Sequence, residues 1–373
     1  MPQGTTSFAR LEEDGGAAVA QTVRETLGRL RAGEPLRAGK LTLIPLLPVE
    51  EGIAHATGYL PLESAVAQQV LAVTEKPAAT VPELVVSSTA EAPVLMICGE
   101  QVIGGLQNRV FNTTMLVAAH TALDVPVTCV EMGRWHGAGA RGFGSRRAGQ
   151  PGAAPERAFT SAEPAYARMR AKHMSYVTKS LASGGGYTSD QSEVWEEVSE
   201  RLSSTGVSSG TSAMRAMYEM PARSTSMDET VARLPRPKGA LGFVAIVAGK
   251  PVGGEIFTDD ALAEAYWPRL TRSYAMDALD SLWSTAASEA QSSASDEERA
   301  QGPDVAESEA DFLAGAREAE VQAYVSPGLG SDVRLAGARL AGAGLVHEGA
   351  LVHLSLFPAE EEEAAAQPAT QQP

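Results

Sequence analysis

Directional polar side chains are concentrated in residues 99–135. The segment holds two glutamates, Glu100 near its start and Glu131 near its end. Amide, guanidinium and indole groups accompany them: Gln107, Asn108, Arg109, Asn112, Arg134 and Trp135. An ordinary core contains few side chains that all need hydrogen-bond partners. We therefore expect this segment to form a site that recognises a polar small molecule.

The two carboxylates predict one of two roles. If the ends of their strands converge, Glu100 and Glu131 would serve as catalytic acid and base at a glycosidic or phosphoribosyl bond. The alternative is that each forms a structural ion pair with Arg109 or Arg134, because an arginine–carboxylate fork needs no ligand.

The neutral residues suit a ligand with ribose, base or phosphate groups. Gln107, Asn108 and Asn112 offer amide donors and acceptors beside Arg109. Asparagine also favours turns, which accounts for one or two of these residues without any ligand. The arginine Arg134 would add a cationic contact, and Trp135 would either stack on a base or sugar or cover the edge of a sheet.

The sequence contains no recognised motif for binding a metal or a cofactor. The six histidines show neither HxH nor HExxH spacing, and phosphate-loop, GxSxG and Rossmann fingerprints are missing. We therefore expect no metal site and no cofactor. The two cysteines, Cys98 and Cys129, lie in apolar runs and are expected to be buried, reduced thiols.

Composition narrows the class of partner. The net charge of −16 argues against binding to nucleic acid, for which a basic face supplies most of the affinity. No apolar run reaches membrane-spanning length, and the N-terminus lacks a signal-peptide pattern, so a cytoplasmic protein is expected. A small molecule is the expected partner, and nothing in the pattern indicates an oligomeric state.

The order of strand and helix patterns predicts an α+β fold. Strand patterns occupy residues 41–135 and 240–257 and recur as short strands in 335–356, while 165–220 is helical. We expect a largely antiparallel sheet, with a barrel-like form as one option, and a helical segment inserted between N- and C-terminal strand regions.

Composition also divides the chain. We expect an N-terminal helix with a frayed end in residues 1–40, a single domain in 41–358, and a disordered acidic, Ala-, Gln- and Pro-rich tail in 359–373. Within the domain, the composition of residues 137–164 predicts a mobile arginine-containing loop, and that of residues 286–301 predicts a polar insert.

Two similar stretches predict matching hairpins. Residues 94–105 and 244–254 each run from an apolar strand through a glycine and a charged residue to Gly-Gly. This places Glu100 at the tip of the first hairpin and leaves Lys250 and Glu255 at a solvated second turn.

Helix signals occur further along the chain. Asp190 predicts an N-cap for a helix over 191–202. Pro268 should kink or split a helix that begins at Asp259-Asp260.

The 99–135 block resembles the ARPP-1 family, a bacterial and archaeal family named for its association with ARG and rhodanese-phosphatase superfamily proteins. The resemblance lies in the motifs GE, GGLQNR, NT, PVTCVE and GRW, and it extends over roughly residues 41–357. Leu106 stands where the family pattern has a lysine. The resemblance implies a role near NAD or ADP-ribose metabolism, and it supplies no catalytic residues.

Three functions follow from these patterns. The first is non-catalytic recognition of a nucleotide- or ADP-ribose-like molecule, and the second is a hydrolase or transferase that uses Glu100 and Glu131. The third is a scaffold in which the block forms a buried polar seam. If the side chains of the block point into an open pocket, ligand recognition or catalysis is favoured. If they are buried and bonded to one another, the scaffold is favoured.

Overall fold

The largest element of the fold is a nine-stranded antiparallel sheet. The computed structural model describes residues 8–49, 53, 57–134, 159–280 and 304–359. Two short strands, β1 (Leu30–Ala32) and β2 (Leu36–Ala38), pair with one side of β3 (Leu41–Pro48). The order then continues through β13 (Gly242–Val247), β14 (Lys250–Phe257), β18 (Ala350–Pro358), β17 (Leu340–His347), β16 (Ser331–Ala336) and β15 (Glu320–Val325).

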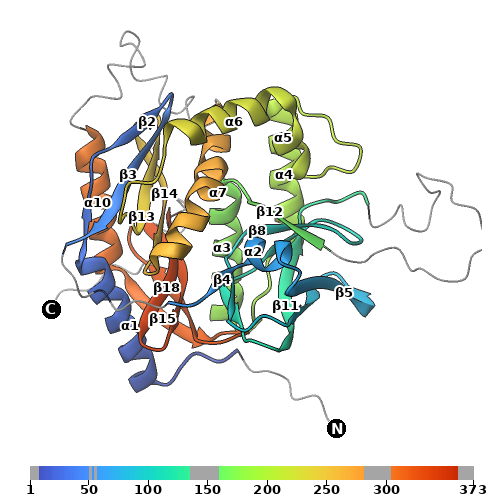
Figure 1. The fold of residues 1–373 in the computed structure, drawn as a ribbon, viewed down its shortest axis with the longest axis horizontal. Helices are drawn as coiled ribbons and strands as arrows, with labels where there is room; N and C mark the ends of the chain where they lie inside the picture. The colour runs from blue at the N-terminus through green and yellow to red at the C-terminus, as the bar shows by residue number, and fades with distance from the viewer. Residues whose placement is uncertain (1–7, 50–52, 54–56, 135–158, 281–303, 360–373) are drawn as a thin grey trace, which may run out of the picture.

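Helices cover both faces of this sheet (Figure 1). On β13, Phe243 and Ala245 point into a core shared with α3 (Ala167–Ala182) and α7 (Asp260–Leu279). Val244 and Ile246 point the other way, into a core with α1 (Glu13–Gly28) and α10 (Asp304–Glu318). Because successive side chains of a strand face opposite sides, a sheet covered twice needs apolar residues at every position, and β13 is buried throughout.

A second, six-stranded sheet carries most of the polar block. It curls into a half-barrel around its own apolar core, and its two edge strands contact each other. The order is β12 (Phe159–Pro164), β8 (Glu100–Gly104), β9 (Arg109–Phe111), β11 (Ala122–Cys129), β6 (Glu83–Ser88) and β5 (Leu71–Thr80).

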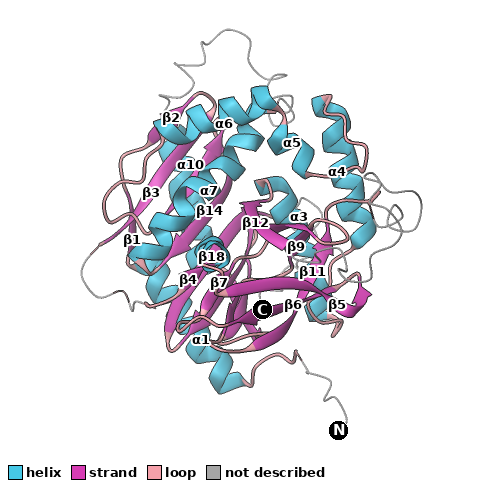
Figure 2. Ribbon diagram, turned by 45° about the vertical axis from the view of Figure 1, so that its right-hand side comes forward, coloured by secondary structure: helices cyan, strands magenta, loops and turns pink. Residues whose placement is uncertain are grey.

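The remaining elements connect the two sheets. A three-stranded sheet consists of β10 (Met115–Val117), β7 (Val94–Met96) and β4 (Leu60–Pro61), and α2 (Leu62–Ala67) follows directly. After α3 the chain passes through α4 (Gln191–Thr205), α5 (Arg215–Glu219) and α6 (Pro221–Arg233), which arch over the molecule in Figure 2. The α+β class, the antiparallel sheets and the inserted helices are therefore as expected.

Two local predictions met different outcomes. Asp190 caps α4, because its carboxylate accepts the backbone N–H groups of Ser192 and Glu193. Pro268 lies inside α7, which runs unbroken from Asp260 to Leu279, so the predicted split is wrong. Burial of neighbouring side chains such as Tyr266 and Leu270 offsets the backbone hydrogen bond that proline removes.

The predicted 137–164 loop is wrong for its last residues. Phe159–Pro164 forms β12, which pairs with β8 and so belongs to the half-barrel. The rest of that loop, the 286–301 insert and residues 360–373 lie outside the described residues.

Only one of the two predicted hairpins forms. β13 and β14 pair as a hairpin, as expected. The first stretch instead divides between two sheets, since β7 pairs with β4 and β10 while β8 pairs with β9 and β12. Glu100 therefore begins β8 in the interior and does not lie at a hairpin tip.

Candidate functional site

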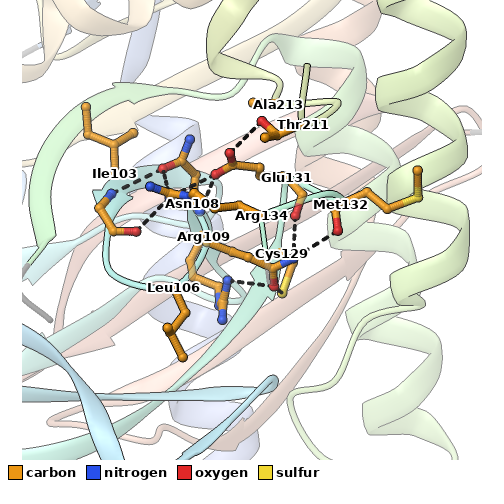
Figure 3. Close-up of polar contacts among 12 residues, drawn as sticks. Ile103, Leu106, Asn108, Arg109, Cys129, Glu131, Met132, Arg134, Thr211 and Ala213 are labelled. Carbon is orange, nitrogen blue, oxygen red and sulfur yellow. Dashed lines mark hydrogen bonds and ion pairs between the residues drawn. The ribbon is translucent and has the colours of Figure 1, made fainter. Parts of the chain in front are cut away.

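A polar seam runs beside the half-barrel and contains Asn108, Arg109, Glu131 and Arg134 (Figure 3). Gln107 joins it through hydrogen bonds to the Glu131 carbonyl and to Arg109. Glu131 lies at the centre of the seam and is 4% exposed. Its carboxylate accepts the backbone N–H of Asn108 at 3.1 Å, the hydroxyl of Thr211 at 2.7 Å and Nη2 of Arg134 at 2.8 Å. The Glu131 carboxylate is therefore satisfied within the protein.

The outer end of the seam is built around Asn108. Its Oδ1 accepts the N–H of Gly104 at 3.1 Å and Nη2 of Arg134 at 2.9 Å. Nη2 of Arg134 also donates to the carbonyl of Gly104 at 2.8 Å (Figure 3). The Arg134 side chain is 38% exposed, so the seam reaches solvent here.

The inner end is built around Gln107. Its Nε2 donates to the carbonyls of Glu131 at 2.7 Å and Met132 at 3.2 Å, while its Oε1 accepts from Arg109 at 3.3 Å and from the Cys129 thiol at 3.2 Å. Arg109 is fully buried, and this burial lowers the pKa of its guanidinium.

Glu100 belongs to a separate group of contacts. Its carboxylate accepts the N–H of Ile97 at 3.2 Å and the hydroxyl of Tyr266 at 3.3 Å, and it pairs with Arg269. Burial raises the pKa of Glu100, although the Arg269 guanidinium acts in the opposite direction. Glu100 and Glu131 share no partner among these contacts.

Asn112 links β11 of the half-barrel to the loop between α3 and α4. Its Nδ2 donates to the carbonyl of Tyr187 at 2.8 Å, and its Oδ1 accepts the Thr128 hydroxyl at 2.8 Å. Trp135, which was expected either to contact ligand or to cover the edge of a sheet, lies outside the described residues.

The structure therefore gathers Gln107, Asn108, Arg109, Glu131 and Arg134 into one network and leaves Glu100 and Asn112 in others. All except Arg134 are at least nine-tenths buried and bonded within the protein. The cleft described below is lined by neither Glu100 nor Glu131. This is the arrangement expected of a structural seam.

Glu255 forms a further buried network that the sequence analysis missed. Its carboxylate accepts from Arg170 at 2.6 Å, Tyr274 at 2.8 Å, Ser355 at 2.9 Å and His353 at 3.0 Å. Burial acts to raise the pKa of Glu255, but the Arg170 guanidinium overcomes it and brings the pKa to about 2. The prediction of a solvated turn is wrong for Glu255, whereas Lys250 is exposed.

The Gly-Gly pair before Glu255 is the signal that could have found this network. A Cβ at Gly253 would lie 2.5 Å from the hydroxyl of Tyr274. Glycine therefore allows α7 to approach β14 closely enough for Tyr274 to reach the Glu255 carboxylate.

An open cleft of about 320 Å³ lies next to Glu100, where α7, α6, α5 and β12 meet. We call it the arginine cleft, because three arginines line it. Its lining residues are Glu63, Ser161, Ala162, Glu163, Arg215, Asp228, Val231, Pro268, Arg269 and Arg272. Arg269 and Arg272 share a face of α7 because they are three residues apart.

Acidic side chains hold these arginines in place. Glu163 joins two of them, pairing with Arg215 and, at 3.2 Å, with Nε of Arg272. Burial acts to raise the pKa of Glu163, but the Arg215 guanidinium outweighs it and the net shift is downward. Arg269 contacts Glu100 on its buried side and the Ser161 hydroxyl at 3.0 Å. Arg269 therefore links the cleft to a residue of the block.

Other site types have little support in the described part of the chain. There, no group of three or more His, Cys, Asp and Glu side chains is placed to hold a metal ion. Among the same residues, none of the helices combines the length and apolar character needed to cross a membrane. Both cysteines are buried and free.

Comparisons with known proteins give one result. Neither the curated proteins nor the solved structures contain a match to this chain. A family model does match, over residues 29–357, and its description is ARPP-1, the ARG and Rhodanese-Phosphatase-superfamily-associated Protein domain. The match spans both sheets and the helices between them, so the chain belongs to the ARPP-1 family.

Proposed function

We propose that this chain is a ligand-recognition domain for a small phosphate-bearing molecule, of the nucleotide or ADP-ribose type, and that the ligand binds in the arginine cleft. The observation that carries the proposal is the row of three guanidiniums, Arg215, Arg269 and Arg272, at an open cavity. The planar guanidinium fork matches the oxygen geometry of phosphate, and arginine keeps its charge at every physiological pH.

The arginines are positioned before any ligand arrives. Glu163 fixes two of them, and Glu100 fixes the third from the interior. Side chains already held in place lose little conformational freedom on binding. An anion that bound in the cleft would therefore meet arginines that are already in position.

The cleft also offers an apolar surface. Ala162, Val231 and Pro268 line it beside the charged groups. Ligand sites commonly combine apolar walls with a few polar groups that fix orientation. A ribose or base would contact these residues while its phosphate meets the arginines. The family's association with ARG proteins supports testing ligands of NAD and ADP-ribose metabolism first.

The test is calorimetric titration of the full chain with ADP-ribose, NAD, adenosine 5′-monophosphate and inorganic phosphate. We expect Arg272→Gln to weaken binding at least about tenfold, since a charge-assisted hydrogen bond is worth roughly 1.5–3 kcal/mol. Arg236→Gln is the matched control, because Arg236 is 7% exposed and pairs with Asp260 and Glu264 outside the cleft. Equal affinity in the two variants, or no binding of any compound, would refute the proposal.

A hydrolase or transferase is the second candidate. It is favoured by the contact between Arg269, a cleft residue, and Glu100, whose pKa is raised by burial. Under this proposal Glu100 would act as a proton donor at a glycosidic or phosphoribosyl bond, whereas Glu131 belongs to the separate polar seam and would take no part. Its signature is turnover of ADP-ribose or NAD that Glu100→Gln abolishes. Binding without turnover favours the recognition domain.

A further inference from the structure

The rim of the arginine cleft carries carboxylates that already occupy the arginines. Asp228 is 66% exposed and pairs with Arg272, whose side chain is 14% exposed. Glu63 is 62% exposed and lies 3.4 Å from Nε of Arg269, whose side chain is 10% exposed. In each pair a nearly buried cation meets an acid that is mostly in water.

The other contacts of Arg272 do not depend on Asp228. Nη2 of Arg272 donates to the Ser224 hydroxyl at 2.9 Å, and Nε faces Glu163 at 3.2 Å. If the Asp228 carboxylate turned into solvent, these two contacts would keep the guanidinium in position. Its Nη1 would then be free to donate to another anion at the mouth of the cleft.

A phosphate group is suited to that exchange. Carboxylate and phosphate oxygens accept the same guanidinium N–H groups, and a phosphate monoester carries the larger charge. An ion pair with a largely exposed partner contributes little stability, so an incoming dianion displaces it with a small penalty. Arg215 and Arg272 also share the Glu163 carboxylate, which places two guanidiniums next to the same position.

We infer that Asp228 occupies, in the ligand-free protein, the place of the ligand's phosphate, and that the ligand is a phosphate monoester of mononucleotide or sugar-phosphate size. This inference rests on the proposed function. The cavity of about 320 Å³ is near the lower end of the range for ligand pockets. One sugar phosphate or mononucleotide fills such a space, whereas a dinucleotide extends beyond it.

On binding, the ligand's phosphate then replaces the Asp228 carboxylate at Arg272. Asp228 competes with the phosphate and so lowers the affinity for the ligand. Asp228→Asn removes the competing charge and leaves the three arginines in place, so it should tighten binding. Few substitutions at a binding site raise affinity, which makes this sign a stringent test.

The experiment is calorimetric titration of the full chain and its variants with adenosine 5′-monophosphate and with ribose 5-phosphate at low ionic strength. We expect Asp228→Asn to bind both roughly three- to fivefold more tightly than the wild type, the factor set by an exposed ion pair. Asp260→Asn is the matched control, because Asp260 is 71% exposed and pairs with Arg236 outside the cleft. It should bind as the wild type does. Circular dichroism melting confirms that each variant folds.

The outcomes separate this inference from the proposed function. If the wild type binds these ligands and Asp228→Asn binds them equally or more weakly, the assignment of Asp228 is overturned while the recognition function stands. Binding that is measurable only in Asp228→Asn supports both. If neither protein binds any phosphate compound, both fail. Adenosine, which lacks the phosphate, should bind neither protein, and binding of adenosine at similar affinity overturns the inference.

Discussion

Arg170 on α3 donates from Nη1 to Oε1 of Glu255 on β14 at 2.6 Å, and both side chains are almost completely buried. The pair joins the nine-stranded sheet to the first helix that follows the half-barrel. A buried charge that loses its partner is left without solvation, and such losses typically destabilise a protein by about 3–5 kcal/mol.

Replacing this carboxylate should therefore destabilise the protein strongly. We expect Glu255→Ala to lower the free energy of unfolding by about 3–5 kcal/mol, because Arg170, His353 and Tyr274 would lose their acceptor. Urea denaturation followed by circular dichroism measures the change. Glu264→Gln is the control, since Glu264 is 69% exposed and should shift the free energy by less than about 1 kcal/mol. Similar values for the two variants would contradict the prediction.

The second prediction concerns the pH dependence of stability. Burial lowers the pKa of His173 to about 4, whereas the unfolded chain has a pKa near 6.5. Between these values the unfolded state binds the extra proton, so acidification favours unfolding. The neutral imidazole should contribute about 2 kcal/mol less stability at pH 5 than at pH 7.

Comparison with His173→Gln isolates this contribution. The wild type should lose about 2 kcal/mol more than the variant when the pH falls from 7 to 5, as measured by urea denaturation at each pH. Other titrating groups are common to both proteins and cancel in the difference. Equal losses would show that His173 titrates normally in the folded protein.

The third prediction concerns the Gly-Gly pair of the polar block. Gly105 has a φ of +50°, and a Cβ there would lie 2.3 Å from the ring of Phe159 and 2.8 Å from the Glu75 carboxylate. Gly105→Ala should destabilise the protein by about 3 kcal/mol, from backbone strain and overlap together. Gly39→Ala separates the two effects, because Gly39 has a φ of +60° with no neighbour within 4 Å. It should lower stability by only about 1 kcal/mol. If the melting temperatures of Gly105→Ala and Gly39→Ala fall by the same amount, the overlap with Phe159 and Glu75 has no effect on stability.

The fourth prediction concerns the reactivity of the thiols. Burial raises the pKa of both Cys98 and Cys129 to about 11, and the thiolate is the reactive form. Native protein at pH 8 should therefore react with almost no Ellman's reagent over minutes, and two thiols should react after unfolding in guanidinium chloride. Rapid labelling of the native protein would show that one cysteine is accessible.

The sequence predicted the parts of the fold that depend on local signals. The Asp190 cap and the β13–β14 hairpin follow from residues close together in the chain. Within the block, Gln107, Asn108, Arg109, Glu131 and Arg134 form one network, whereas Glu100 and Asn112 belong to others. A buried seam was one of three alternatives, and the sequence could not select it, because the residues that contact Glu100 include Tyr266 and Arg269, which lie more than 160 residues away.

The arginine cleft was missed for the same reason. Arg269 and Arg272 resemble ordinary surface residues of an amphipathic helix until β12 brings Glu163 beside them. β12 itself follows a glycine- and arginine-rich stretch that gives no strand signal. Glu255 was assigned to a solvated turn because it flanks the second predicted hairpin. Only the pairing of β14 with β18 shows that it faces the interior.

The pairing of β3 with β13 has a consequence for how the chain is made. Leu41 pairs with Val247, a partner about 200 residues later. At roughly 5–20 residues per second, a ribosome needs about 10–40 s to supply that partner. Throughout this interval the edge of β3 that later meets β13 has no partner, and an unpaired strand edge is a template for pairing with another chain. The half-barrel, whose strands are all synthesised in between, has time to fold first and to hold the ends of the large sheet close together.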